Sequence, residues 1–151
     1  MEIQRAVLHG KGDLRIETAS IPDGLEAHQV LVQTEFSAFS TGTDLGNYLG
    51  DSTYVPGAPN YPRGVGYSNA GVVRSTGPGD TSFQRGDRVF SMRPHQSAYI
   101  AEENDLLVRI PEGVSSQSAS LAYLTGLGLA ALRQARTKCD RGHGRIEDRA
   151  P

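Results

Sequence analysis

The chain has 151 residues, a formal net charge of -2 and a pI near 6.1. This length indicates one domain, with or without a tail, and the charge offers no electrostatic case for binding nucleic acid or an anionic membrane. Cys139 is the single cysteine and has no disulfide partner within the chain. The N-terminus lacks the apolar core of a signal peptide, so we expect a soluble, cytoplasmic protein.

Eighteen glycines and eight prolines predict many turns and a mainly β protein. Short runs of alternating or β-branched residues separated by turn residues indicate strands. The expected strands cover residues 3–9, 14–21, 30–39, 66–75, 88–92, 98–101 and 106–110. The turn from Gly10 to Asp13 predicts a hairpin between the first two. Residues 43–49 could form a short helix capped by Thr43 or its neighbour, and residues 55–64, with three prolines, predict an ordered loop.

From Ser115 the hydrophobic period becomes helical. Ser115 or Ser116 can cap a helix over residues 116–135, which is apolar almost all round. Such a helix calls for burial, and two interpretations remain open. It packs on its own barrel, or it lies between this domain and a partner, which makes it a candidate surface for self-association.

The composition changes at Arg136. Residues 136–151 are polar, without a usable hydrophobic period, and we expect a disordered tail there. The arginines of this tail are diluted by acidic residues and no aromatic residue lies among them, which argues against nucleic-acid binding. Cys139 and His143 alone are too few donors for a metal site.

Several short motifs follow one another in a characteristic order. They are Thr41-Gly42-Thr43-Asp44, Gly66 and Gly71 with four residues between them, Gly86-Asp87-Arg88-Val89, Ala98-Tyr99-Ile100, Leu107 to Pro111, and Thr125-Gly126. Together they resemble the GroES-like N-terminal domain of the medium-chain dehydrogenase/reductases, the alcohol dehydrogenase-like superfamily. The resemblance covers residues 3–135 and implies a partly open β-barrel with a short helix and one C-terminal apolar helix.

The resemblance also implies chemistry: the family's barrel carries substrate-side catalytic residues and is joined to a Rossmann domain that binds NAD(P). Zinc-dependent members supply Cys, His and a further Cys or carboxylate ligand. Here Thr41, Tyr67 and Leu121 stand in those three positions, and Ser68 replaces a glutamate. Neutral hydroxyls and a leucine bind zinc poorly or not at all, so we expect no zinc.

The remaining polar residues give the candidate site. Thr43 matches a proton-relaying hydroxyl of the family, and Asp44 matches a carboxylate that orients the histidine ligand. With Tyr67 in place of that histidine, we predict an Asp44–Tyr67 hydrogen bond. Thr125 matches a residue near the nicotinamide, although a hydroxyl in a helix can equally bond to a preceding carbonyl. His95, in a short connection, is interpreted as a surface histidine.

The glycines at 142 and 144 follow no apolar strand, so they do not form a dinucleotide-binding fingerprint. We therefore expect this chain to bind no NAD(P), although a full-length relative would use it with a small-molecule substrate. The change at Arg136 suggests a truncated gene product or an out-of-frame extension. The leading hypothesis is the substrate-side domain of a zinc-independent NAD(P)-dependent alcohol dehydrogenase/quinone reductase-like oxidoreductase, inactive alone. The alternative is a non-enzymatic binding or assembly module on the same barrel.

Overall fold

A computed structural model describes residues 1–50, 60–79, 82–102 and 104–142. The chain begins with a hairpin of β1 (Glu2–Gly10) and β2 (Asp13–Ser20), whose register pairs Gly10 with Asp13. Gly12 adopts φ 74° in the turn, a conformation that glycine takes without steric strain. β4 (Arg63–Gly64) pairs with the other edge of β1, so the first sheet has the order β2-β1-β4. The predicted hairpin is confirmed, and β4 is a short strand where only a loop was expected.

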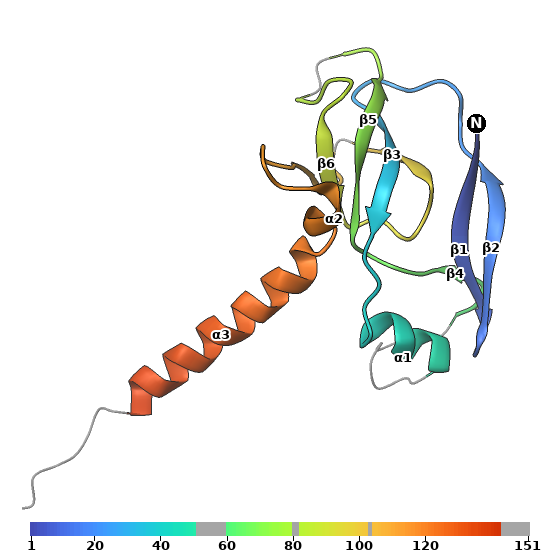
Figure 1. Ribbon diagram of the computed structural model, residues 1–151. Helices are drawn as coiled ribbons and strands as arrows, with labels where there is room; N and C mark the ends of the chain where they lie inside the picture. The colour runs from blue at the N-terminus through green and yellow to red at the C-terminus, as the bar shows by residue number, and fades with distance from the viewer. Residues whose placement is uncertain (51–59, 80–81, 103, 143–151) are drawn as a thin grey trace, which may run out of the picture.

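The second sheet is antiparallel and has the order β7-β3-β5-β6-β8. Its strands are β3 (Val30–Ser37), β5 (Asn69–Thr76), β6 (Arg88–Ser91), β7 (Ala98–Ala101) and β8 (Leu107–Arg109). Each lies within or almost within an expected segment. Figure 1 shows this sheet facing the β1–β2 hairpin.

Backbone hydrogen bonds join the two sheets through the segment before β7. The Ala6 amide donates to the His95 carbonyl at 2.9 Å, and the Ser97 amide donates to the Gln4 carbonyl at 2.8 Å. These bonds close one side of the barrel, so the expected partly open, mainly β barrel is confirmed. They also fix the backbone of His95 against β1.

The core of the second sheet consists mainly of valine side chains, together with one tyrosine and one alanine. Its buried members are Val30, Val32, Val73, Val89, Tyr99 and Ala101. Burying one valine side chain stabilises the folded state by about 1.5–3 kcal/mol. Because β-branched side chains also fit the pleated, half-buried surface of a sheet, alternating valines favour strands here. Tyr99 is buried with its hydroxyl 2.7 Å from Ser91 Oγ, so its polar atom keeps a partner. A second cluster of Ala6, Leu8 and Val65 lies under β1.

Two short helices flank the barrel. α1 (Thr43–Leu49) has the bounds expected from the sequence and ends at Gly50, whose φ of 67° is left-handed. The Gly12 amide donates to the Tyr48 carbonyl at 2.8 Å, which ties the end of α1 to the hairpin turn. α2 (Ser116–Ala119) begins at Ser115, whose hydroxyl accepts a hydrogen bond from the Ser118 amide at 3.0 Å. The predicted serine cap is therefore confirmed.

α3 (Ala122–Gly142) differs from the expected helix in three respects. The helix predicted over 116–135 is interrupted at Ser120 and Leu121. α3 then continues past Arg136 to Gly142, where Lys138 and Arg141 favour a helix and no proline interrupts it. The expectation of a tail without structure from residue 136 is thus corrected for residues 136–142, and residues 143–151 lie outside the described part.

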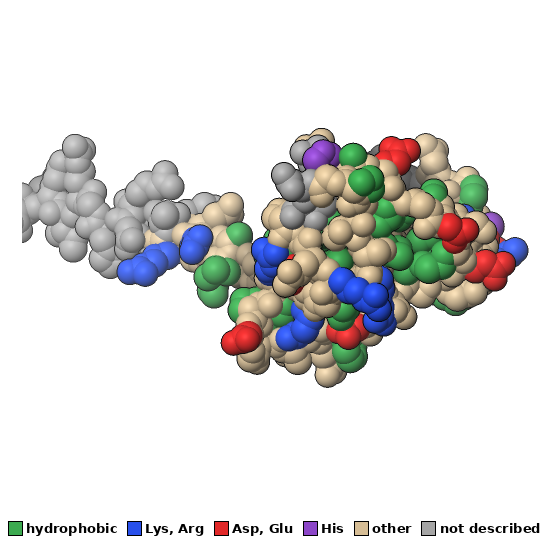
Figure 2. All heavy atoms as spheres, turned by 90° about the horizontal axis from the view of Figure 1, so that it is seen from above, with side chains coloured by type: hydrophobic (Ala, Val, Ile, Leu, Met, Phe, Trp, Pro, Cys, Tyr) green, Lys and Arg blue, Asp and Glu red, His purple; other side chains and the backbone are tan. Residues whose placement is uncertain are grey.

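The third difference is the direction of α3. Figure 1 shows it projecting away from the barrel, and Figure 2 shows apolar and basic side chains along the described part of it. Leu127, Leu129 and Leu132 are 51%, 50% and 70% exposed. The interpretation of a helix packed on its own barrel is therefore wrong. Within the described residues, no helix combines the length and the apolar character needed to cross a bilayer.

Candidate functional site

The link from β3 into α1 places the first group of candidate residues. The Ser40 amide donates to Asp44 Oδ2 at 2.7 Å, and the Thr43 amide donates to Ser40 Oγ at 3.2 Å. These two reciprocal hydrogen bonds give acceptors to one amide just before the helix and to the first amide within it. The N-cap residue is Gly42. As a result Thr43 is half-buried and Asp44 is turned into the protein, with 1% of its side chain exposed.

Asp44 lies next to His95 rather than next to Tyr67. His95 Nε2 is 3.9 Å from Asp44 Oδ2, and His95 Nδ1 is 2.8 Å from Ser37 Oγ. Asp44 Oδ1 and His95 Nε2 are both buried without a hydrogen-bond partner. The predicted Asp44–Tyr67 hydrogen bond does not form, and that prediction is wrong. His95 is also not a surface residue, because only 18% of its side chain is exposed.

Gly66 explains this exchange of partners. It has φ 89°, and the imidazole ring of His95 fills the space beside its α-carbon. The ring can approach because glycine has no Cβ. His95 therefore occupies the position beside Asp44 that we expected Tyr67 to take.

Tyr67 points instead toward α3. Its ring makes an edge-to-face contact with Tyr123, with centroids 5.2 Å apart and an interplanar angle of 75°. The next residue, Ser68, is fully buried and donates its hydroxyl hydrogen bond to the Ser120 carbonyl. The segment before β5 is thereby attached to the junction of α2 and α3.

Thr125 lies one turn further along α3 and is exposed. Its hydroxyl donates to the Leu121 carbonyl at 3.0 Å, which is the local bond that a helical threonine commonly makes. Tyr67 thus contacts Tyr123 at the start of α3, and Asp44 lies beside His95. The candidate residues therefore belong to two separate pairs.

The three residues that the resemblance sets at the family's zinc positions are a poor donor set for zinc. Thr41 and Tyr67 offer neutral oxygen atoms and Leu121 offers none, whereas zinc sites are built from thiolate, imidazole and carboxylate ligands. Among the described residues, no group of three or more His, Cys, Asp or Glu side chains lies close enough to hold a metal ion. The side chain of Cys139 and all of His143 lie outside the described part.

An apolar pocket of about 290 Å³ lies between α1, the hairpin and the segment carrying His95. Its lining consists of Leu8, Leu14, Phe39, Asp44, Leu45, Tyr48, Val65 and His95. Sequence reasoning named Asp44 but missed His95 and the pocket. No local signal could have found them, since their neighbours come from segments that are distant along the chain and meet only in the folded barrel.

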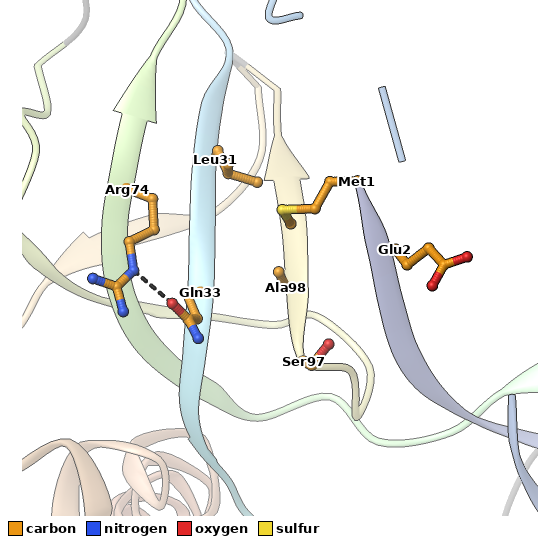
Figure 3. Close-up of a pocket in the computed structure, with 7 residues that line it drawn as sticks. All are labelled: Met1, Glu2, Leu31, Gln33, Arg74, Ser97 and Ala98. Atoms are coloured by element: carbon orange, nitrogen blue, oxygen red, sulfur yellow. Dashed lines mark hydrogen bonds between the residues drawn. The ribbon is translucent and has the colours of Figure 1, made fainter. Parts of the chain in front are cut away.

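A second pocket, of about 310 Å³, is shown in Figure 3 between the N-terminus and strands β3, β5 and β7. Arg74 donates from Nε to Gln33 Oε1 at 2.6 Å, so the guanidinium is already engaged along the sheet. None of the candidate residues lines this pocket. Asp44 is the one candidate residue that lines the first of these two pockets, and Thr43, Tyr67 and Thr125 line neither of them.

The alcohol dehydrogenase GroES-like domain family matches residues 26–132. The chain belongs to this family. The expected resemblance to medium-chain dehydrogenase/reductases is confirmed, and α1, the Tyr67 segment and the first half of α3 all lie within the matched range.

The curated relatives include (R,R)-butanediol dehydrogenase of Bacillus subtilis. It is 24% identical over an alignment of 163 residues, gaps included, that covers 86% of this chain and 46% of the relative. They also include quinone oxidoreductase of Salmonella typhimurium, 32% identical over 83 residues that cover 53% of this chain and 25% of the relative. This chain thus spans less than half the length of these relatives.

Solved structures of two dehydrogenases superpose on the barrel. Galactitol-1-phosphate dehydrogenase from Escherichia coli matches with a TM-score of 0.70 at 16% identity, over 88% of this chain and 45% of that one. The 2R,3R-butanediol dehydrogenase of Bacillus subtilis matches with a TM-score of 0.65 at 22% identity, over 79% and 43%. At these identities the likeness establishes the fold.

Proposed function

We propose that this chain is the substrate-side domain of a zinc-independent, NAD(P)-dependent oxidoreductase of the alcohol dehydrogenase and quinone reductase type. The observation that carries the proposal is the family match over residues 26–132 combined with Thr41, Tyr67 and Leu121 at the zinc positions. The similarity to a butanediol dehydrogenase and to quinone oxidoreductases supports the reaction class.

Zinc independence follows from what the three side chains can do. Without a thiolate, imidazole or carboxylate, the site has no ligand of the kind that polarises a substrate oxygen through zinc. The substrate oxygen must then be held by hydrogen bonds. Thr43, half-buried at the start of α1, and the Tyr67 phenol, beside Tyr123, are the hydroxyls we assign to that role. Asp44 holds the first turn of α1 and so positions Thr43.

Hydride transfer requires a bound nicotinamide, which supplies or accepts the hydride. Among the described residues, no strand is followed directly by a glycine-rich loop and a helix, which is the unit that binds a dinucleotide. These residues therefore do not fit the cofactor. We therefore propose that this chain alone neither binds NAD(P) nor turns over substrate. Thr125 remains a candidate contact to a nicotinamide held by a separate domain.

The test joins this chain to the cofactor-binding domain of a quinone oxidoreductase relative and measures NADPH-dependent quinone reduction. We expect activity that is insensitive to a zinc chelator. A Tyr67→Phe variant should lower kcat/KM by about tenfold or more, because it removes one hydrogen bond to the substrate oxygen. Tyr61→Phe is the matched control, since that phenol packs against the cluster under β1. Loss of activity on chelation, or a folded but inactive hybrid, would contradict the proposal.

A second candidate function is a non-enzymatic binding or assembly module. The observation that favours it is the exposed apolar surface of α3, including Leu127, Leu129 and Leu132. Sedimentation analysis of the wild-type chain tests self-association through this helix. A Leu127→Asp variant should then dissociate the assembly, whereas Leu106→Asp, at an equally exposed leucine on the barrel, should not. A monomeric wild-type chain would exclude self-association.

A further inference from the structure

The pocket of about 310 Å³ in Figure 3 contains a guanidinium group without a carboxylate partner. Arg74 is exposed and donates from Nε to Gln33 Oε1 at 2.6 Å. Ion pairs with acidic side chains are formed by Arg5, Arg15, Arg93 and Arg109. Within the described residues, Arg74 forms none. Because a guanidinium carries five N–H donors in a fork that suits a carboxylate, the two terminal nitrogens of Arg74 can bind an anion.

A β-bulge places Arg74 beside Gln33 on the face of the second sheet opposite its valine core. Along β5, Ser75 and Val73 both have register partners on β3, and Arg74 between them has none. Such a bulge redirects a side chain locally. Because arginine only donates hydrogen bonds, the Gln33 amide turns Oε1 toward it, and the Nε2 donors of Gln33 are left for another acceptor. One end of the pocket thus offers N–H donors from two exposed residues.

The acidic groups around this pocket do not neutralise Arg74. Glu2 also lines the pocket, but Figure 3 shows its carboxylate pointing away from Arg74 and Gln33. The carboxylate of Asp23 is 2.5 Å from the ammonium group of Met1, so these two groups neutralise each other. The donor end of the pocket therefore carries a net positive charge.

The rest of the pocket is a short and mostly apolar floor. It is formed by Leu31 of β3 and Ala98 of β7, and Figure 3 shows the Met1 side chain extending toward Ala98. Ser97 borders this floor and accepts a hydrogen bond from the Gln4 amide. Neighbouring strands lie about 4.8 Å apart, so the backbones of β5 and β7 are about 10 Å apart across β3. A carboxylate head with an aliphatic chain of about five carbon atoms spans most of that distance.

We propose that this pocket binds a small monocarboxylate with an aliphatic chain. The carboxylate is ionised at neutral pH and accepts charge-assisted hydrogen bonds from the Arg74 guanidinium, together with a hydrogen bond from Gln33 Nε2. The aliphatic chain covers Leu31 and Ala98. An alcohol of the same length lacks the charge, and acetate lacks the chain. This inference goes beyond the proposed function, because it involves neither a nicotinamide nor the hydroxyls assigned to the substrate oxygen.

Hexanoate, 1-hexanol and acetate are the probes, since they separate the contribution of the charged head from that of the chain. Titration of the 15N-labelled chain at neutral pH should show saturable binding of hexanoate, with shifts of the Arg74 Nε–H, the Gln33 side-chain amide and the Ala98 backbone amide. We expect 1-hexanol and acetate each to bind about tenfold more weakly. An affinity for either of them within about twofold of that for hexanoate, or no saturable binding of hexanoate, would overturn the proposal.

Two variants and two matched controls locate the binding. Arg74→Gln removes the charge, and Gln33→Glu supplies an internal carboxylate beside Arg74, so each should weaken hexanoate binding by about tenfold or more. Arg85→Gln and Gln84→Glu make the same charge changes at exposed positions outside the pocket and should alter the affinity by less than about twofold.

Undiminished hexanoate binding in Arg74→Gln, or an equal loss in Arg85→Gln, would overturn the assignment. If Arg74→Gln does not fold, Gln33→Glu and the comparison of the three probes on the wild-type chain still decide. Because no hydride transfer is measured, failure here is distinguishable from failure of the proposed reaction.

Discussion

The imidazole of His95 lies so close to Gly66 that a Cβ atom at residue 66 would stand 2.5 Å from His95 Cδ2. The approach is possible because Gly66 has φ 89° and no side chain. It brings His95 Nε2 within 3.9 Å of Asp44 Oδ2 and leaves Tyr67 free to contact Tyr123. One glycine thus separates the two pairs of candidate residues.

A Gly66→Ala substitution should destabilise the protein for two reasons, its positive φ and its contact with His95. Gly86→Ala is the matched control, since Gly86 has φ 96° but no described neighbour within 4 Å of the point where a Cβ atom would stand. We expect a loss of about 1 kcal/mol for Gly86→Ala from backbone strain alone, and about 3 kcal/mol for Gly66→Ala. Urea unfolding measures both. Equal losses would mean that the His95 ring moves aside without cost.

Stability should fall at alkaline pH because of Tyr99. Burial raises the pKa of Tyr99 to about 12, against an ordinary value of 10.0. Between these values the unfolded chain has released the phenolic proton and the folded chain still holds it. The free energy of unfolding therefore does not depend on Tyr99 below pH 10.0, and it falls by about 1.4 kcal/mol per pH unit between pH 10.0 and about 12.

Tyr99→Phe removes this ionisation and keeps the ring. The difference in unfolding free energy between wild type and Tyr99→Phe should be constant below pH 10 and should shift in favour of the variant above it. Since other groups titrate alike in both proteins, the difference isolates Tyr99. A difference that stays constant to pH 11 would contradict the raised pKa.

The sequence predicted those parts of the fold that depend on local patterns. Alternating valines and glycine turns located the long strands, and α1 was expected over its observed range. β4 was missed because its two residues form a strand only by pairing with Val7 and Leu8 of β1. The direction of α3 was also not predictable, since a helix that is apolar all round does not indicate which face is covered.

The site was predicted less completely than the fold. Asp44 is buried, and Tyr67 lies near the start of α3, but the partner of each was wrong or missing. His95 is 51 residues from Asp44 and 29 residues from Gly66 along the sequence, by subtraction of their numbers, so no spacing rule relates them. Tyr123 carried a weak signal, because it stands just before the Thr125-Gly126 motif.

Gly126 offers a test of α3 itself. No described neighbour lies within 4 Å of the place that a Cβ atom of residue 126 would take, so alanine fits there without a clash. Because alanine favours the helix over glycine by about 1 kcal/mol, Gly126→Ala should raise the helical signal in far-UV circular dichroism. Gly71→Ala is the contrasting variant, since its Cβ would stand 2.2 Å from the Gln33 carbonyl oxygen, and it should strongly destabilise the barrel. A weaker helical signal in Gly126→Ala than in wild type would contradict this account of α3.

Ser68 should couple the barrel to the junction of α2 and α3. Its buried hydroxyl donates to the Ser120 carbonyl, and Ser68→Ala would leave that carbonyl without this partner. We expect a loss of about 1–2 kcal/mol in unfolding free energy. Ser82→Ala, at an exposed serine, should change stability by less than about 0.5 kcal/mol. If the two variants are equally stable, the Ser68 hydrogen bond contributes nothing net.

The central proposal is that the substrate-side domain formed by this chain binds no zinc. The most direct measurement is the zinc content of the folded chain after incubation with zinc and dialysis, determined by mass spectrometry of the metal. We predict less than about 0.1 equivalent in wild type and in Cys139→Ser, since Thr41, Tyr67 and Leu121 supply no suitable ligand. A variant with both Thr41→Cys and Tyr67→His restores two of the family's ligands and should retain more zinc. About one equivalent of tightly held zinc in wild type and in Cys139→Ser would contradict the account.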